Sequence, residues 1–176
     1  MSIKRQFANF TLALSGLLVI SNSAFAATAT GTFPVTATVA NTCTVSSTGV
    51  AFGSYTGALV TNTTNNIVVT CNKGVAIASF FIGDGANPSG TQKQMAFGAE
   101  RLAYNIDQPV ATALTTCPAA GTNSWNGTAG PTGANLSALF ATTGGAKNIP
   151  ICASIPAAQF PAGGAYTDTI TMTLTY

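Results

Sequence analysis

The side chains of this sequence offer little of the chemistry that enzymes use. The 176-residue chain has no histidine, so it holds no Ser-His-Asp or Cys-His arrangement and no histidine metal ligand. Four carboxylates lie in separate segments: Asp84, Glu100, Asp107 and Asp168. A glycosidase-like pair would require folding to bring two of them together. The segment 83–87 resembles a turn more than a calcium loop, because later acidic ligands are missing. We predict a protein that is not an enzyme and uses no cofactor or metal.

The remaining reactive side chains are four cysteines, and they indicate disulfides: Cys43, Cys71, Cys117 and Cys152. The absence of histidine and of any Cys-x-x-Cys pair argues against a zinc site. An even number of cysteines in an exported chain is typical of disulfides formed in an oxidising compartment. Three pairings are open from sequence alone. We favour Cys43–Cys71, which should join neighbouring strands, together with Cys117–Cys152.

Residues 1–26 have the features of a secretory signal peptide. Lys4 and Arg5 form a basic start, residues 10–20 are mostly apolar, and Ala24-Phe25-Ala26 is a small-x-small cleavage site. The apolar run is too short to span a bilayer, although an N-terminal anchor is the alternative. We expect the chain to be exported and its mature form to begin at Ala27, which leaves enough residues for one domain with a sizeable core.

The mature chain carries few charges, and they balance. Four basic residues, Lys73, Lys93, Arg101 and Lys147, stand against the four carboxylates, so the formal charge of +2 belongs to the signal peptide. No basic face remains to neutralise phosphates, which excludes nucleic acid as the expected partner. Because net charge keeps soluble monomers apart, a neutral surface suits a protein that packs against copies of itself.

Apolar and polar residues alternate along the mature chain, which is typical of β-strands with one buried face. An early run places four apolar residues on one face: Phe33, Val35, Ala37 and Val39. The last run does the same, with threonines opposite: Ile170, Met172, Leu174 and Tyr176. Further strands are expected at 66–71, 75–82 and 149–155, with a hairpin of 94–97 and 101–106 around Gly98.

Two stretches are expected to be loops, 54–65 and 115–147. The second is longer than a compact domain usually leaves without secondary structure, so we expect a short strand within it at 136–141. Trp125 and Tyr55 could stack on sugars, but aromatic side chains in such loops more often cover the end of a sandwich. Short strands with Gly, Pro and Asn between them predict a β-sandwich, and the strands found are too few to close both of its edges.

Three segment pairs carry a more specific pattern. They are TGTFPVTATVANTCTV at 30–45 with AFGSY at 51–55; IVVTC at 67–71 with LAYNI at 102–106; and IPAAQ at 155–159 with AGGAYTDTITMTLTY at 162–176. Together they resemble the spore-coat-U family, whose members include subunits of archaic chaperone–usher pili. The terminal Tyr-x-Asp-Thr run that ends in Tyr is the most specific part. Region 115–147 departs from the family pattern, and Cys117 and Cys152 are an addition to it.

The resemblance implies an all-β fold, an incomplete immunoglobulin-like sandwich completed by a donor strand from a neighbouring subunit. It divides the mature chain into a donor extension, 27–39, and a pilin domain, 40–176. The apolar face of the extension would enter the neighbour's groove, while the apolar face of the last strand would border the groove and bind a periplasmic chaperone. An outer-membrane usher would then join the subunits into a homopolymer, or a polymer with related pilins. The expected product is a cell-surface pilus that serves adhesion and biofilm formation.

Alternatives of other classes remain open at this stage. The chain could be a secreted coat or matrix protein of the same fold, or a sugar-binding adhesin module. Segment 27–39 could also be the first strand of its own complete sandwich. A two-domain adhesin would need a longer chain and no donor segment at its own N-terminus, which favours a rod subunit.

Overall fold

The computed structural model describes residues 26–110, 114–125 and 133–176. Apart from Ala26, the predicted signal peptide lies outside these residues. The chain divides into two units, Met1–Thr38 and Val39–Tyr176, and each is described by itself. In the first unit, residues 26–38 form no helix or strand, and every one of them is exposed. All regular structure within the described residues belongs to the second unit.

One sheet of this domain contains three antiparallel strands in the order β1-β3-β7. They are β1 (Cys43–Ser47), β3 (Asn66–Cys71) and β7 (Gly145–Pro150). The β-branched run of β3 suits a pleated surface. It buries Ile67, Val69 and Cys71 at alternate positions, so the strand predicted at 66–71 is confirmed. β1 is an edge strand whose second edge has no β-partner within the described residues.

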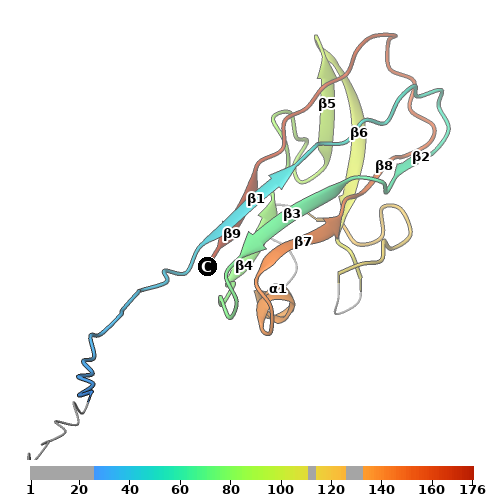
Figure 1. Cartoon of the computed structure of the whole chain (residues 1–176). Coiled ribbons are helices and arrows are strands. Elements are labelled where there is room, and N and C mark those ends of the chain that lie inside the picture. The colour runs from blue at the N-terminus through green and yellow to red at the C-terminus, as the bar shows by residue number, and fades with distance from the viewer. Residues whose placement is uncertain (1–25, 111–113, 126–132) are drawn as a thin grey trace, which may run out of the picture. The chain divides into compact units, whose positions relative to one another are not determined.

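A second sheet contains four antiparallel strands in the order β2-β8-β6-β5 (Figure 1). They are β2 (Val60–Asn62), β8 (Cys152–Ile155), β6 (Glu100–Asp107) and β5 (Lys93–Phe97). β5 and β6 form the predicted hairpin, and Gly98 takes the positive φ of 57° that its turn requires. The prediction that 54–65 forms only a loop is partly wrong, because β2 lies within this range.

The last strand, β9 (Met172–Thr175), pairs with β4 (Ser79–Ile82) in a separate two-stranded sheet. The chain just before β9 also reaches β5, since Ala96 and Thr167 exchange two backbone hydrogen bonds of 2.9 and 3.1 Å. The C-terminal segment therefore runs along β5 first and along β4 afterwards. The apolar faces of all three sheets share one buried cluster, so the prediction of an all-β sandwich is confirmed.

The single strand predicted at 149–155 is wrong. The chain forms β7 in one sheet, passes through Ile151, and continues as β8 in the other. Ile151 donates its backbone N–H to the carbonyl of Asn65, at the point where the partner strands β2 and β3 also change sheets. Pro150 has no N–H with which to continue the ladder. Both sheets pack on the same core. Residues 149–155 therefore stay mostly apolar, and the sequence gives no sign of the change from one sheet to the other.

The short strand predicted at 136–141 is also wrong, because this segment forms the helix α1 (Gly133–Phe140). Leu136 and Phe140, four residues apart, are fully buried, and Leu139 packs against the same core. The Ser137 hydroxyl accepts the Ile77 N–H at 2.8 Å and donates to the Ile77 carbonyl at 3.2 Å. The backbone of Ile77 is thus bonded to a helix side chain and not to a neighbouring strand. This explains why the strand predicted at 75–82 begins only at Ser79.

Trp125 covers the core and is not available to a sugar. Its ring is fully buried and meets Phe80 edge-on, with the ring centroids 5.3 Å apart. The buried position favours a structural role for Trp125 over stacking on a sugar, as the sequence suggested. None of the helices in the described ranges combines the length and apolar character needed to cross a membrane.

Both favoured disulfides are present, Cys43–Cys71 and Cys117–Cys152. Cys43 and Cys71 are direct partners in the β1–β3 ladder, so this bridge joins neighbouring strands as expected. The second bridge joins Cys117, in the segment that follows β6, to Cys152, the first residue of β8.

Replacing Cys43 and Cys71 together by alanine should lower the free energy of unfolding by about 3–4 kcal/mol. The bridge closes a 28-residue separation and restricts the unfolded chain. Urea unfolding of the double variant beside the wild type measures the difference. Cys117→Ala with Cys152→Ala is the matched comparison, since its 35-residue separation predicts nearly the same loss. An unchanged unfolding free energy in either variant would contradict this account.

Candidate functional site

An open groove runs along the domain between two chain segments. One rim is formed by residues 47–57, which begin at the end of β1, and the other by residues 159–172, which lead into β9. Two cavities of about 760 and 440 Å³ make up the groove. Both are lined by Val50, Phe52, Met95 and Tyr166, so they are continuous.

Each rim joins an edge strand at one end: residues 47–57 begin at the last residue of β1, and residues 159–172 end at the first residue of β9. Among the described residues, β1 pairs with β3 alone and β9 with β4 alone. The two strands lie near one another, yet within the described residues no β-pairing joins them. An edge strand presents a row of N–H and C=O groups that another strand can use. Here the edges of two neighbouring strands border one end of the groove, at Ser47 of β1 and Met172 of β9.

Side chains from both main sheets form the floor of the groove. Ile67 of β3, Tyr104 and Ile106 of β6, and Met95 of β5 line its smaller cavity. Phe52 on the first rim meets the Tyr104 ring edge-on, with the centroids 6.1 Å apart. An apolar floor favours burial of apolar side chains from an incoming chain.

Two polar side chains fix the larger cavity. Gln159 bonds both backbone groups of Ala103 in β6, accepting the N–H at 2.8 Å and donating to the C=O at 3.0 Å. The Tyr55 hydroxyl donates to the Pro156 carbonyl at 2.7 Å and accepts the Gln159 N–H at 3.1 Å. These bonds connect the two rims and hold them on β6. The AFGSY and IPAAQ segments thus meet at the groove.

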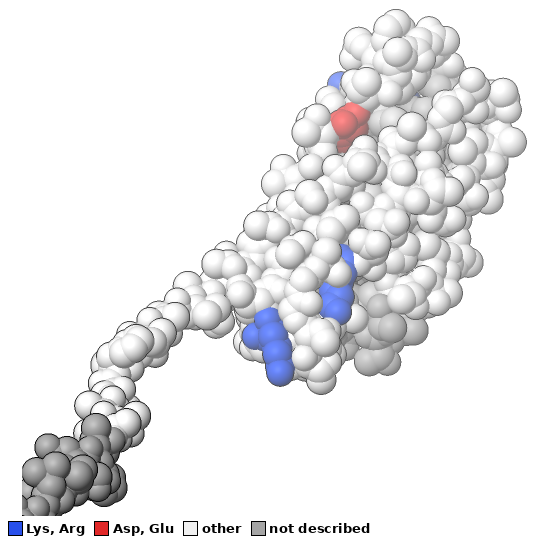
Figure 2. Space-filling view, in the orientation of Figure 1, with Lys and Arg blue, Asp and Glu red and all other residues white. Residues whose placement is uncertain are grey.

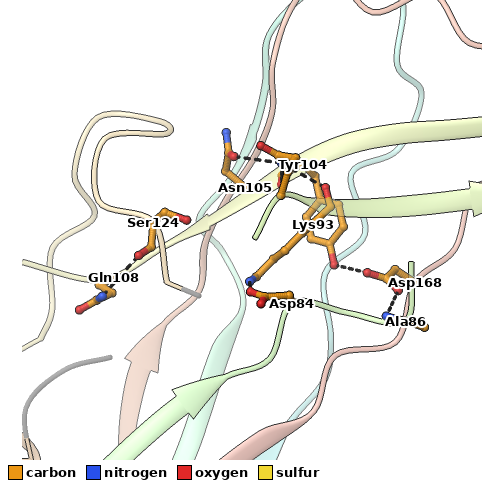
Figure 3. A network of polar contacts seen from close by, with 9 residues as sticks. Asp84, Ala86, Lys93, Tyr104, Asn105, Gln108, Ser124 and Asp168 are labelled. Atoms are coloured by element: carbon orange, nitrogen blue, oxygen red, sulfur yellow. Dashed lines mark hydrogen bonds and ion pairs between the residues drawn. The ribbon is translucent and has the colours of Figure 1, made fainter. Parts of the chain in front are cut away.

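A polar network lies beside the smaller cavity (Figure 3). The Tyr104 hydroxyl donates to Asp168 at 2.6 Å, and the Ala86 N–H donates to the same carboxylate at 2.8 Å. Burial raises the pKa of Tyr104 far above its usual value, and the hydrogen bond to Asp168 and its charge add to the shift. Tyr104 therefore keeps its proton and remains a donor. Lys93, also buried, pairs with Asp84 at 3.2 Å.

The structure places two of the four predicted groove residues at one rim. Ile170 and Met172 line the smaller cavity, whereas Leu174 and Tyr176 lie outside both cavities. Leu174 packs against the core, and the Tyr176 side chain is 54% exposed. The alternation expected in this run is present, because each threonine between them is exposed. Binding of a partner by these residues stays a prediction.

The residues predicted to form a donor strand are exposed. Phe33, Val35 and Val39 are 82, 85 and 78% exposed, and Ala37 is exposed as well. Three large apolar side chains at alternate positions are thus in contact with solvent, which is costly unless another chain covers them. Their insertion into a neighbour stays a prediction.

Sequence reasoning missed the opposite rim and the polar contacts. Val50 and Phe52 lie across the groove from Ile170 and Met172, and Asp168 and Gln159 hold the second rim. The sequence contained a signal for three of the four missed residues, because Phe52, Gln159 and Asp168 belong to segments that carry the family pattern. The pattern gives no partners, however, and Tyr104 and Asp168 are 64 residues apart.

The surface of the domain has few charged groups. On the face shown in Figure 2, isolated blue and red patches interrupt an otherwise uncharged surface. Within the described ranges, no group of three or more His, Cys, Asp or Glu residues could hold a metal ion.

Comparisons with known proteins place the chain in a family. A solved structure of the CsuC–CsuE chaperone–tip adhesion subunit pre-assembly complex, from archaic chaperone–usher Csu pili of Acinetobacter baumannii, contains a similar chain at 19% identity and a TM-score of 0.49. The match covers 79% of this chain and 40% of that one, so this chain spans less than half of its length. No curated protein matches the sequence. The Spore Coat Protein U domain matches residues 29–173. This match covers most of the sequence, and the chain therefore belongs to the Spore Coat Protein U domain family.

Proposed function

We propose that this protein is a structural subunit of a surface pilus, and not an enzyme. In the proposed fibre, residues 27–39 of one subunit enter the groove of the next and pair with its β1 and β9. The observation that carries the proposal is the open groove with apolar side chains on its floor, which begins beside the edge strands β1 and β9. The same chain also has an exposed extension with the alternating pattern of a strand.

Strand addition would satisfy both surfaces at once. The incoming backbone supplies hydrogen bonds to the two edges, and its alternate side chains enter the cavities. The groove and the extension would otherwise expose apolar area and unpaired backbone groups, a combination that promotes aggregation. A donor from another copy covers both.

Insertion of the extension into its own domain is disfavoured by the short connection. Only Ala40, Asn41 and Thr42 separate the proposed donor from β1. Thr42 is held in place, because its N–H donates to the Asn72 side chain at 3.0 Å and its carbonyl accepts the Asn72 N–H at 3.1 Å. Two residues remain for a reversal, without the Asn-Gly-type sequence that tight hairpins prefer.

The proposed route of assembly follows from the exposed groove. A periplasmic chaperone would cover it after export, and an outer-membrane usher would exchange the chaperone for the next subunit. The finished fibre would serve adhesion and biofilm formation at the cell surface. The proposal rests on the family assignment together with the groove, since a domain with such a groove needs a covering partner before assembly.

Electron microscopy of cells with and without the protein tests the proposal. Thin fibres that label with an antibody against the domain, and that vanish when the coding sequence is deleted, are the expected result. An amorphous layer without fibres would support the coat-protein alternative. Soluble monomers in the medium would contradict both assembled forms.

A further inference from the structure

The second rim of the groove changes its strand partner partway along. Thr167 pairs with Ala96 of β5, whereas the Thr171 carbonyl accepts the N–H of Gly83, the residue that follows β4, at 2.8 Å. Three residues, 168–170, bridge these two attachments. Ile170 lies in this bridge and lines the smaller cavity. A movement of this bridge would therefore change the lining of the smaller cavity.

The Asp168 carboxylate holds the bridge on three sides. One oxygen accepts the Tyr104 hydroxyl at 2.6 Å from the floor. The other accepts the Ala86 N–H at 2.8 Å from the turn after β4 and the Thr169 N–H at 2.8 Å. Charge-assisted hydrogen bonds are the stronger kind, and Tyr104 remains protonated to make one. The rim, the floor and a neighbouring turn thus meet at one side chain.

The turn at Gly85 is shaped for this carboxylate. Gly85 has a φ of 92°, and a Cβ atom there would lie 2.0 Å from an Asp168 oxygen. Only glycine allows both the backbone conformation and the close approach. The neighbouring Asp84 pairs with the buried Lys93 of β5, which ties the same turn to the sheet.

We propose that Asp168 is a positioning residue that keeps the groove open for an incoming strand, acting with Tyr104 and the Gly85–Ala86 turn. We call these four residues the Asp168 clasp. This inference rests on the proposed function, since it assigns the clasp to the strand-binding groove. Without the clasp, residues 168–170 keep their backbone attachments at Thr167 and Thr171 and the packing of Ile170 against the core. The rim then moves, and an arriving strand must reorder it before pairing.

The test uses the mature chain with Val35→Asp and Ala37→Asp in its own extension, so that the extension no longer acts as a donor. We call this chain the acceptor variant. Its probe is a synthetic peptide covering residues 28–40. Adding Asp168→Ala should slow peptide association at least tenfold and raise hydrogen exchange at the Thr167 and Gly83 amides. Asp168→Asn, which keeps an acceptor oxygen, should restore part of the rate, and Gly85→Ala should resemble Asp168→Ala.

Leu139→Ala on α1 is the matched control, because it removes core packing away from the rim. It should lower global stability without changing peptide association or exchange at Thr167. If Asp168→Ala leaves association and amide protection unchanged, the clasp is wrong and the donor proposal stands. If it slows association no more than Leu139→Ala does, the clasp is only structural and the inference fails. An acceptor variant with intact Asp168 that ignores the peptide overturns the donor proposal itself.

Discussion

A peptide covering residues 28–40 should strongly stabilise the acceptor variant against thermal and urea unfolding. Burial of Phe33, Val35, Val39 and the smaller Ala37 contributes about 5–9 kcal/mol at the usual value for apolar side chains. Backbone pairing with β1 and β9 adds to this, and ordering of the peptide offsets part of it. The rise in unfolding temperature with peptide concentration measures the net effect.

Peptides with a single charge on either face provide the control. Val35→Asp and Ala37→Asp bring a carboxylate into the apolar groove and should abolish stabilisation. Thr36→Asp adds the same charge on the opposite face and should bind nearly as well as the unchanged peptide. Equal effects of both charges would contradict the assigned face. A wild-type chain that stays monomeric at high concentration without chaperone would refute polymerisation.

Pro34 limits how the peptide can lie. It lacks an N–H and cannot donate to a ladder, so its nitrogen must face away from a partner strand or lie near the end of pairing. Because the proposed donor pairs with β1 on one side and β9 on the other, we expect pairing to be continuous only from Val35 onward. Hydrogen exchange of the bound peptide should therefore protect residues after Pro34 more than those before it.

A tag fused to Tyr176 should abolish secretion of the subunit. The proposed chaperone would hold the terminal carboxylate with basic residues, because a carboxylate buried in that complex without a partner is costly. The last residue is accessible for such a contact, since Tyr176 is 54% exposed. Immunoblots of periplasmic and surface fractions measure the loss. The same tag inserted at the exposed turn of Gly90 is the control and should be tolerated. Normal pili from the C-terminally tagged subunit would contradict the role.

Patterns of period two predicted the strands whose two faces differ. β3, the β5–β6 hairpin and the alternation before β9 were expected because each has one face on the core and one toward solvent. β8 could not be separated from β7 in the same way, since all four of its residues are buried. The sequence does contain a signal for the helix, because Leu136, Leu139 and Phe140 are spaced as on one face of a helix.

One rim of the groove could be anticipated from the sequence, whereas its contacts could not. Ile170 and Met172 were expected from alternation, which marks a face without saying what lies opposite. Tyr104 meets Asp168 only because β6 and the C-terminal segment come together in the fold. Gly85 looked like an ordinary turn residue, and the need for glycine there depends on a carboxylate far along the chain.

The Cys43–Cys71 bridge gives the proposed fibre a path for mechanical load. Tension carried by the extension enters the domain at Cys43, the first residue of β1. β1 is an edge strand, and a pull on its first residue would peel its hydrogen bonds from β3 one pair at a time. The sulfur bridge transfers that force directly to Cys71 in β3, the middle strand of its sheet. A covalent bond thus protects the point where peeling would begin, and reduced subunits should yield at a lower pulling force than oxidised ones.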